Sequence, residues 1–259
     1  MSLAALEWSI IGPALAAGLL VLSTHVPLGR EVLARGIIFI DLAIAQIAAL
    51  GVVAAGALGF ESTLLVQTAA ASAAMLGALV MTWTEKRWPE TQEAFIGVAF
   101  VVSASAGLLL LAHNPHGGEH LKDLLAGQIL WVGWRELWPA LLVSGPLLVA
   151  WFGLRARLGR AGFYLLFALA VTASVQLVGV YLVFASLILP ALATRGRQGV
   201  GALWGGYLVG VFGYALGLAA SALADLPSGP TVVCALALAA GAAPLFRRRR
   251  RAVAGETTR

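Results

Sequence analysis

The sequence predicts an all-α protein, a polytopic bundle of about eight transmembrane helices. Of its 259 residues, 60% are hydrophobic and only 11% are charged. Soluble domains carry about a quarter charged residues, so this chain lacks the polar side chains needed to cover a soluble globule. The mean hydropathy is +0.91, and Cys234 is the single cysteine. The composition therefore excludes a soluble enzyme, a secreted disulfide scaffold and a disordered chain.

Eight apolar stretches define the predicted spans: residues 8–23, 36–58, 64–83, 94–111, 139–154, 163–193, 200–224 and 231–246. Basic residues occupy alternate loops and the run 247–251, whereas the loops at 59–62, 113–119 and 225–229 carry few. Under the positive-inside rule, the basic loops and the C-terminus face the cytoplasm of a multi-pass inner-membrane protein. We expect one transmembrane domain over residues 1–246 and a basic cytoplasmic tail over 247–259.

The stretch 163–193 is the longest of these spans. As one helix it would be roughly 46 Å long, well beyond a hydrocarbon core of about 30 Å. Its flanking loops are both basic, so we expect two shorter helices with a break between Gln176 and Gly179. The segment 123–133 is too short to span, and we expect it to dip in from the outer face.

Glycines predict where helices pack closely, and tryptophans predict which residues lie at the membrane interface. Repeated G-x-x-x-G steps in 200–224 indicate close helix packing, within one subunit or along a dimer seam. The glycines concerned are Gly201, Gly205, Gly213 and Gly217. Trp131, Trp134 and Trp138 stand at helical spacing, as is typical of an aromatic belt at the membrane interface.

Three polar residues inside apolar spans are candidates for a translocation path. Asp41 is the carboxylate expected well inside a span, where an unpaired charge costs several kcal/mol unless it faces a hydrated path. Gln46 follows on the same helix, and Gln176 lies within the long stretch. The alternative is structural: Asp41 pairs with a neighbouring helix and Gln46 makes an interhelical hydrogen bond.

One predicted external loop is rich in metal-binding side chains. It holds three of the four histidines and a carboxylate: His113, His116, Glu119 and His120. Imidazoles with carboxylates bind zinc and similar divalent ions, so a transient capture site is one interpretation. A solvated polar turn without a metal is the other, because the spacing matches no fixed zinc signature.

Motifs for catalysis are missing from the sequence. It contains no G-x-S-x-G, no H-E-x-x-H and no P-loop, so we expect no enzyme activity and no ATP bound by a P-loop. The net charge of +5 is concentrated at helix ends. We interpret it as a topology signal and expect no nucleic-acid partner.

Four stretches together resemble the permease subunit of zinc/manganese-type ABC importers. They are the span from Arg35 to Gly51 containing Asp41, the block from Val175 to Thr194, the element Asp123-Leu-Leu-Ala-Gly127-Gln-Ile-Leu, and Asp225-Leu-Pro-Ser-Gly229-Pro-Thr231. They occur in the family's order across most of the chain. In the family helix a histidine follows the aspartate by four residues; here that position is Ala45, next to Gln46.

The resemblance implies a dimer of this chain around a central path, in a fold similar to the importers of vitamin B12 and iron chelates. Two cytoplasmic ATPase subunits would bind ATP, and an extracytoplasmic metal-binding protein would deliver the cargo. The expected cargo is a divalent metal ion, zinc in the first place, with manganese or iron as the alternatives. The turn holding Pro190, Thr194, Arg195 and Arg197 would be the coupling element. The rival hypothesis is a self-sufficient secondary carrier or channel that uses Asp41 to couple cations.

Overall fold

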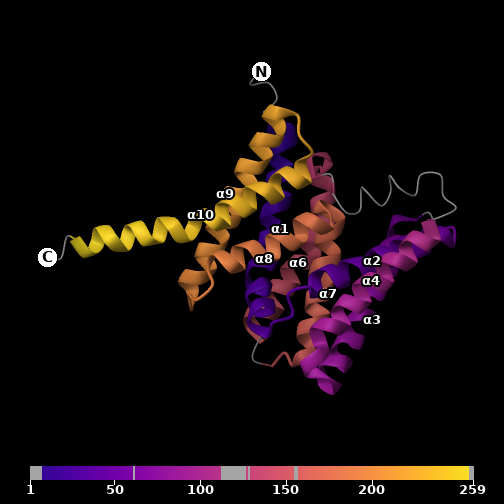
Figure 1. Cartoon of the computed structure of the whole chain (residues 1–259). Coiled ribbons are helices and arrows are strands. Elements are labelled where there is room, and N and C mark those ends of the chain that lie inside the picture. Colours follow the sequence, from indigo (N-terminus) through magenta and orange to yellow (C-terminus); the bar gives the residue numbers. More distant parts are fainter. Residues whose placement is uncertain (1–7, 61, 112–126, 128, 155–156, 257–259) are drawn as a thin grey trace.

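The computed structural model describes residues 8–60, 62–111, 127, 129–154 and 157–256, with side chains up to residue 243, and the regular secondary structure of this part of the chain consists of helices (Figure 1). The α-helices are α1 (Trp8–Arg35), α2 (Ile40–Ala57), α3 (Thr63–Arg87), α4 (Gln92–Leu111), α6 (Trp134–Leu154), α7 (Arg160–Val178), α8 (Val180–Ala193), α9 (Val200–Ala224) and α10 (Ser228–Glu256). Two short 3₁₀ turns, η2 (Pro89–Thr91) and η3 (Ile129–Trp131), complete them.

The predicted all-α membrane bundle is confirmed. Among the described residues, seven helices are long and apolar enough to cross a membrane: α1, α2, α3, α4, α6, α7 and α9. Two shorter apolar helices, α8 and residues 228–243 of α10, join them. The expected number of about eight spans lies between the seven long helices and the total that includes the two shorter ones.

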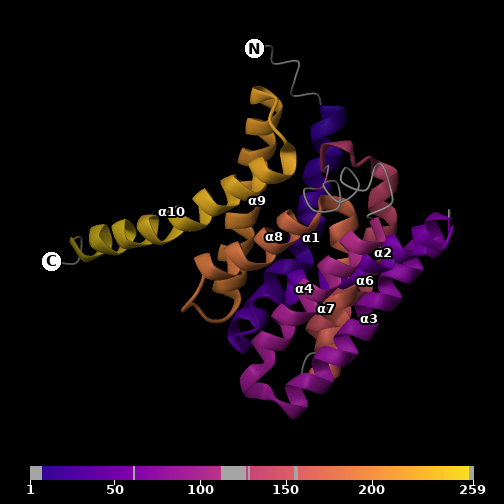
Figure 2. The same cartoon turned by 45° about the vertical axis from the view of Figure 1, so that its right-hand side comes forward.

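The first and last helices extend beyond their predicted spans. Helix α1 continues past residue 23 through Pro27 to Arg35, so the predicted end of the first span was wrong. His25 is fully buried inside α1, and its Nδ1 lies within hydrogen-bond distance, 3.0 Å, of the Val21 carbonyl. Helix α10 runs on past residue 246 to Glu256 (Figures 1 and 2).

Helix α1 lies inside the bundle, against α6, α8 and α9. Its buried face repeats at helical spacing and includes Ala14, Ala17, Val21 and Val32. Gly29 brings α1 into backbone contact with α8, because a Cβ at that position would overlap the Leu187 carbonyl. Gly18 similarly makes room for the buried ring of Tyr214 on α9. In a bilayer, such small residues let helices pack where no hydrophobic gain separates lipid from protein.

The expected break in the long apolar stretch is present. Helix α7 ends at Val178 and α8 begins at Val180, and Gly179 between them has a φ of 79°, which a residue with a side chain rarely adopts. Gly127 packs directly against the backbone of Val178 and Gly179. Ile129 is fully buried. The described residues 127 and 129 thus reach into the bundle, as expected for the segment 123–133.

The glycines of α9 divide between three neighbours. Gly213 and Gly217 receive Leu236 and Val232 of α10, while Gly206 and Gly210 receive Val26 and Leu22 of α1. Gly205 faces the turn before α9, where a Cβ would be 3.0 Å from atoms of Thr194 and Arg197. A Cβ at Gly201 would meet nothing within 4 Å in the described part of the chain. Its expected packing role is therefore not seen within one subunit, since it lies on the exposed side of the first turn of α9.

We predict that Gly29→Ala destabilises the bundle by about 1–3 kcal/mol, because the added methyl group meets backbone of α8 that cannot rotate away. The measurement is the thermal unfolding midpoint of the purified protein in detergent. Gly145→Ala in α6 is the matched control, since nothing lies within 4 Å of its new Cβ. Equal midpoints for the two variants would contradict the tight α1–α8 contact.

Candidate functional site

A cavity of about 600 Å³ lies between α2, α4, α8 and α10, and Gln46 reaches it from α2. Each helix lines it with residues about one turn apart: Leu42 and Gln46; Phe100, Ala104 and Leu108; Val180, Tyr181, Phe184, Ala185, Ile188 and Leu189; Val233 and Ala237. Gln46 is 6% exposed. Its amide and the Tyr181 hydroxyl are the polar groups in a lining that is otherwise apolar.

The local sequence explains why these side chains share one cavity. On an α-helix, residues four apart lie on the same face, and α2 places Leu42 and Gln46 in that relation. The break at Gly179 starts α8 beside the cavity, so its first turns supply Tyr181 and Phe184. The ring of Phe184 stacks on Phe39 with centroids 6.5 Å apart, which connects α8 to the start of α2.

Asp41 lies close to this cavity but does not line it. It stands in the first turn of α2 and is 1% exposed. The expectation of a mid-span position was wrong, because α1 continues to Arg35 and α2 begins only at Ile40. Both carboxylate oxygens are buried without a hydrogen-bond partner among the described residues. Asp41 points roughly 140° around the helix from Gln46, although the adjacent Leu42 does line the cavity.

The start of α2 is held by a residue that sequence reasoning missed. The backbone N–H of Phe39 donates to Oε1 of Glu93 at 3.2 Å, which ties the turn before α2 to the start of α4. Three further contacts gather the ends of α1, α3, α4 and α7 nearby. Arg35 lies 4.0 Å from the centre of the Phe163 ring, Arg160 lies 3.9 Å from Glu85, and Gln92 donates to Tyr164 at 3.3 Å.

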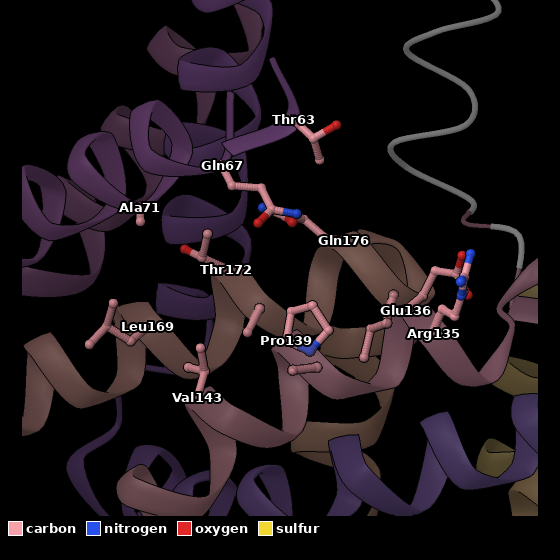
Figure 3. Close-up of a pocket in the computed structure, with 13 residues that line it drawn as sticks. Thr63, Gln67, Ala71, Arg135, Glu136, Pro139, Val143, Leu169, Thr172 and Gln176 are labelled. Atoms are coloured by element: carbon pink, nitrogen blue, oxygen red, sulfur yellow. The ribbon is translucent and has the colours of Figure 1, made fainter. Parts of the chain in front are cut away.

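Gln176 is separated from Gln46. It is exposed near the end of α7 and lines a second cavity of about 430 Å³, formed by α3, α6 and α7 (Figure 3). The two cavities have no lining residue in common. The structure therefore does not bring the three predicted path residues together.

The turn between α8 and α9 is a compact, anchored element. Pro190 and Thr194 are buried, and Thr194 donates its hydroxyl to the Pro190 carbonyl at 3.0 Å. Arg195 and Arg197 are exposed. Arg30 of α1 holds the turn by two hydrogen bonds, which its guanidinium donates to the carbonyls of Gly199 at 3.2 Å and Arg197 at 3.3 Å. A scan for motifs within the turn could not identify Arg30, which is more than 160 residues away.

The proposed capture residues His113, His116, Glu119 and His120 lie outside the described residues. Within the part of the chain that the structure describes, no cluster of three or more histidine, cysteine or acidic residues is placed to hold a metal ion. The oxygen atoms of Gln46 and Tyr181 line the larger cavity, and the Asp41 carboxylate lies beside it on α2.

Comparison with known proteins identifies relatives of this chain. The model of the ABC 3 transport family matches residues 7–158 and 148–246. Among solved structures, PsaBC from Streptococcus pneumoniae in complex with Fab superposes with a TM-score of 0.73 at 19% identity, covering 92% of this chain and 91% of that one. An inward-facing protein assigned to the metal-chelate type of ABC transporters gives 0.60 at 20% identity, covering 90% and 83%. No curated protein sequence matches.

We predict that Arg30→Gln frees the turn between α8 and α9, because the glutamine is too short to donate to both carbonyls. Backbone amide exchange at residues 195–200, followed by mass spectrometry, should accelerate by about threefold or more. Arg87→Gln, at the exposed end of α3, removes an equal charge elsewhere and should leave that exchange unchanged. Unaltered exchange in Arg30→Gln would show that the turn is held by other contacts.

Proposed function

Because the chain belongs to the ABC 3 transport family, we propose that it is the membrane permease subunit of an ATP-binding-cassette importer for divalent metal ions. The family match across almost the whole chain carries this proposal. The fold shared with PsaBC and with a transporter of the metal-chelate type supports it. Zinc is the proposed cargo, with manganese and iron next; a separate subunit would hydrolyse ATP.

We place the translocation path at the cavity beside Gln46. One wall of that cavity is α4, whose outward face is apolar and unusually bare: Val98, Val101 and Val102 are each about 60% exposed. Only four residues of α4 are buried. A second copy of the chain, packed against α4 and α10, would cover this face and close two half-cavities into one central path.

Within the proposed path, Gln46 would contact the ion and Asp41 would attract it. In the zinc/manganese-type importers, a histidine follows the aspartate on the matching helix. An amide oxygen is a weaker zinc ligand than an imidazole nitrogen, and weak binding suits an ion that makes only brief contact during passage. Asp41 is the single charged residue of α2. In its ionised form, this buried carboxylate would act on a cation over several ångströms without direct contact. Gln176 is left out of the proposed path, because it lines the other cavity.

The partners would dock at opposite ends of the molecule. The turn with Arg195 and Arg197 would enter a groove of the ATPase on the cytoplasmic side, held in place by Arg30. The basic C-terminus would lie on the same side. An extracytoplasmic metal-binding protein would deliver the ion at the other side, where the histidines of the 113–120 loop would meet it.

Reconstitution in liposomes tests the proposed function. Zinc uptake should require the companion ATPase and ATP, and should stop when ATP is withheld. Uptake by this chain alone, independent of ATP, would instead identify a self-sufficient carrier or channel and overturn the importer proposal.

We predict that Asp41→Asn lowers uptake at least about tenfold while the thermal midpoint stays equal or rises, because an unpaired buried charge is removed. Asp225→Asn is the matched control. That residue is exposed and left-handed at the end of α9, a conformation that asparagine tolerates. Undiminished transport by Asp41→Asn would exclude Asp41 from the mechanism.

We predict that two copies cross-link through α4. In a Cys234→Ala background, Val101→Cys should form a disulfide-linked dimer on mild oxidation in membranes, since Val101 is 58% exposed on the proposed interface. Leu142→Cys on α6 is 72% exposed but faces away, and should remain monomeric. The opposite pattern would move the interface to α6.

A further inference from the structure

The second cavity has a polar mouth and an apolar floor. It lies between α3, α6 and α7, has a volume of about 430 Å³, and is separate from the cavity beside Gln46. Its polar lining residues are Thr63, Gln67, Arg135, Glu136, Thr172 and Gln176. The others are apolar and include Val143 and Leu169.

A buried hydroxyl inside this cavity lacks a partner. Thr172 is 5% exposed, and its Oγ1 makes no hydrogen bond with any described residue. Thr172 lies six residues before the end of α7 at Val178, about 9 Å along the helix axis. A buried hydroxyl without a hydrogen bond costs free energy, so Thr172 is suited to donate to an acceptor that enters the cavity.

The other polar side chains of the lining lie on all three helices around the cavity. Figure 3 shows Gln67 of α3 and Gln176 of α7 pointing toward one another, with Arg135 and Glu136 of α6 at one side of the cavity. Glu136 accepts a hydrogen bond from the N–H of Gly133 at 2.9 Å. Arg135 is exposed and lines the cavity, so its guanidinium can face an anion at the mouth.

The surroundings of the cavity match the edge of a bilayer. Most of α3 and α6 is exposed, and their outward side chains are apolar, with Leu76 64% and Leu142 72% exposed. Trp131, Trp134 and Trp138 are all exposed where α6 begins, beside Arg135. Exposed tryptophans at a helix end mark the level of the lipid headgroups. The cavity therefore opens at headgroup depth and descends toward the acyl chains.

We propose that this cavity binds an anionic phospholipid from the leaflet opposite the basic loops. Arg135 pairs with the phosphate, a geometry that a guanidinium serves through two parallel hydrogen bonds. Gln67, Gln176 and Thr172 donate to the ester carbonyls of the glycerol backbone. The acyl chains continue past Val143 and Leu169 onto the exposed face of α6, since the cavity is smaller than a whole phospholipid.

Arg135 and Glu136 both line the mouth, and the Glu136 carboxylate already accepts the hydrogen bond from Gly133. The exposed guanidinium of Arg135 attracts a phosphate. This inference does not rest on the proposed transport function, and it stands whichever solute the other cavity carries.

Native mass spectrometry tests the proposal on the full chain released from nanodiscs containing equal amounts of phosphatidylglycerol and phosphatidylcholine. The unaltered protein should retain phosphatidylglycerol preferentially. Arg135→Gln should reduce that retention about tenfold, as expected for a lost charge-assisted contact. Thr172→Val, which keeps the side-chain volume, should reduce it about threefold.

Two variants control for charge and for the loss of a hydroxyl. Arg87→Gln and Thr68→Val lie outside the cavity, on exposed positions of α3, and should retain the lipid fully. Retention that is equal in Arg135→Gln, Thr172→Val and the unaltered protein would overturn the proposal. Displacement of the lipid by millimolar inorganic phosphate would also overturn it, and would identify a site for free anions. Because Arg135 is exposed, its substitution leaves the packed interior of the bundle unchanged.

Discussion

Close backbone contact between α1 and α8 is the constraint on which the rest of the structure depends. In lipid, apolar side chains gain little by leaving the membrane for the protein, so helices associate where small residues permit close approach. Gly29 provides that approach at Leu187, and Gly206 and Gly210 provide it between α9 and α1. Helix α1 is thereby fixed in the interior, where nearly every other element is positioned against it directly or through one neighbour.

This contact links the cavity to the turn between α8 and α9. Leu187 touches Gly29, while Ile188 and Leu189, the next residues of α8, line the cavity beside Gln46. On the other side, Arg30 follows Gly29 and holds the carbonyls of the turn. Gly29 and Arg30 of α1 therefore contact the middle of α8 and the turn that follows it. The wall of the cavity and the turn are thus joined through the same two neighbouring residues of α1.

Local patterns in the sequence predicted the elements whose boundaries are set locally. The span 200–224 matches α9 at both ends, because glycine at residue 199 and the polar segment after residue 224 stop the helix. The break at Gly179 followed from the length of the stretch 163–193 and from the basic loops at both of its ends. The extension of α1 through Pro27 was missed, since proline usually ends a helix and only the surrounding bundle sustains it here. That extension moved Asp41 to the first turn of α2, and the contacts of Arg30 and Glu93 depend on tertiary structure.

The two cavities differ in the charged residues nearest to them, which composition alone does not reveal. Asp41 directly precedes Leu42, which lines one cavity, whereas Arg135 and Glu136 both line the other. Each charge stands at or near a helix end, and the helix interiors between them are apolar. A chain with only 11% charged residues can therefore still place different charged side chains at its two cavities. The field of a charge is strong where water is scarce, and this difference is the basis on which we propose a cation at one cavity and an anionic lipid at the other.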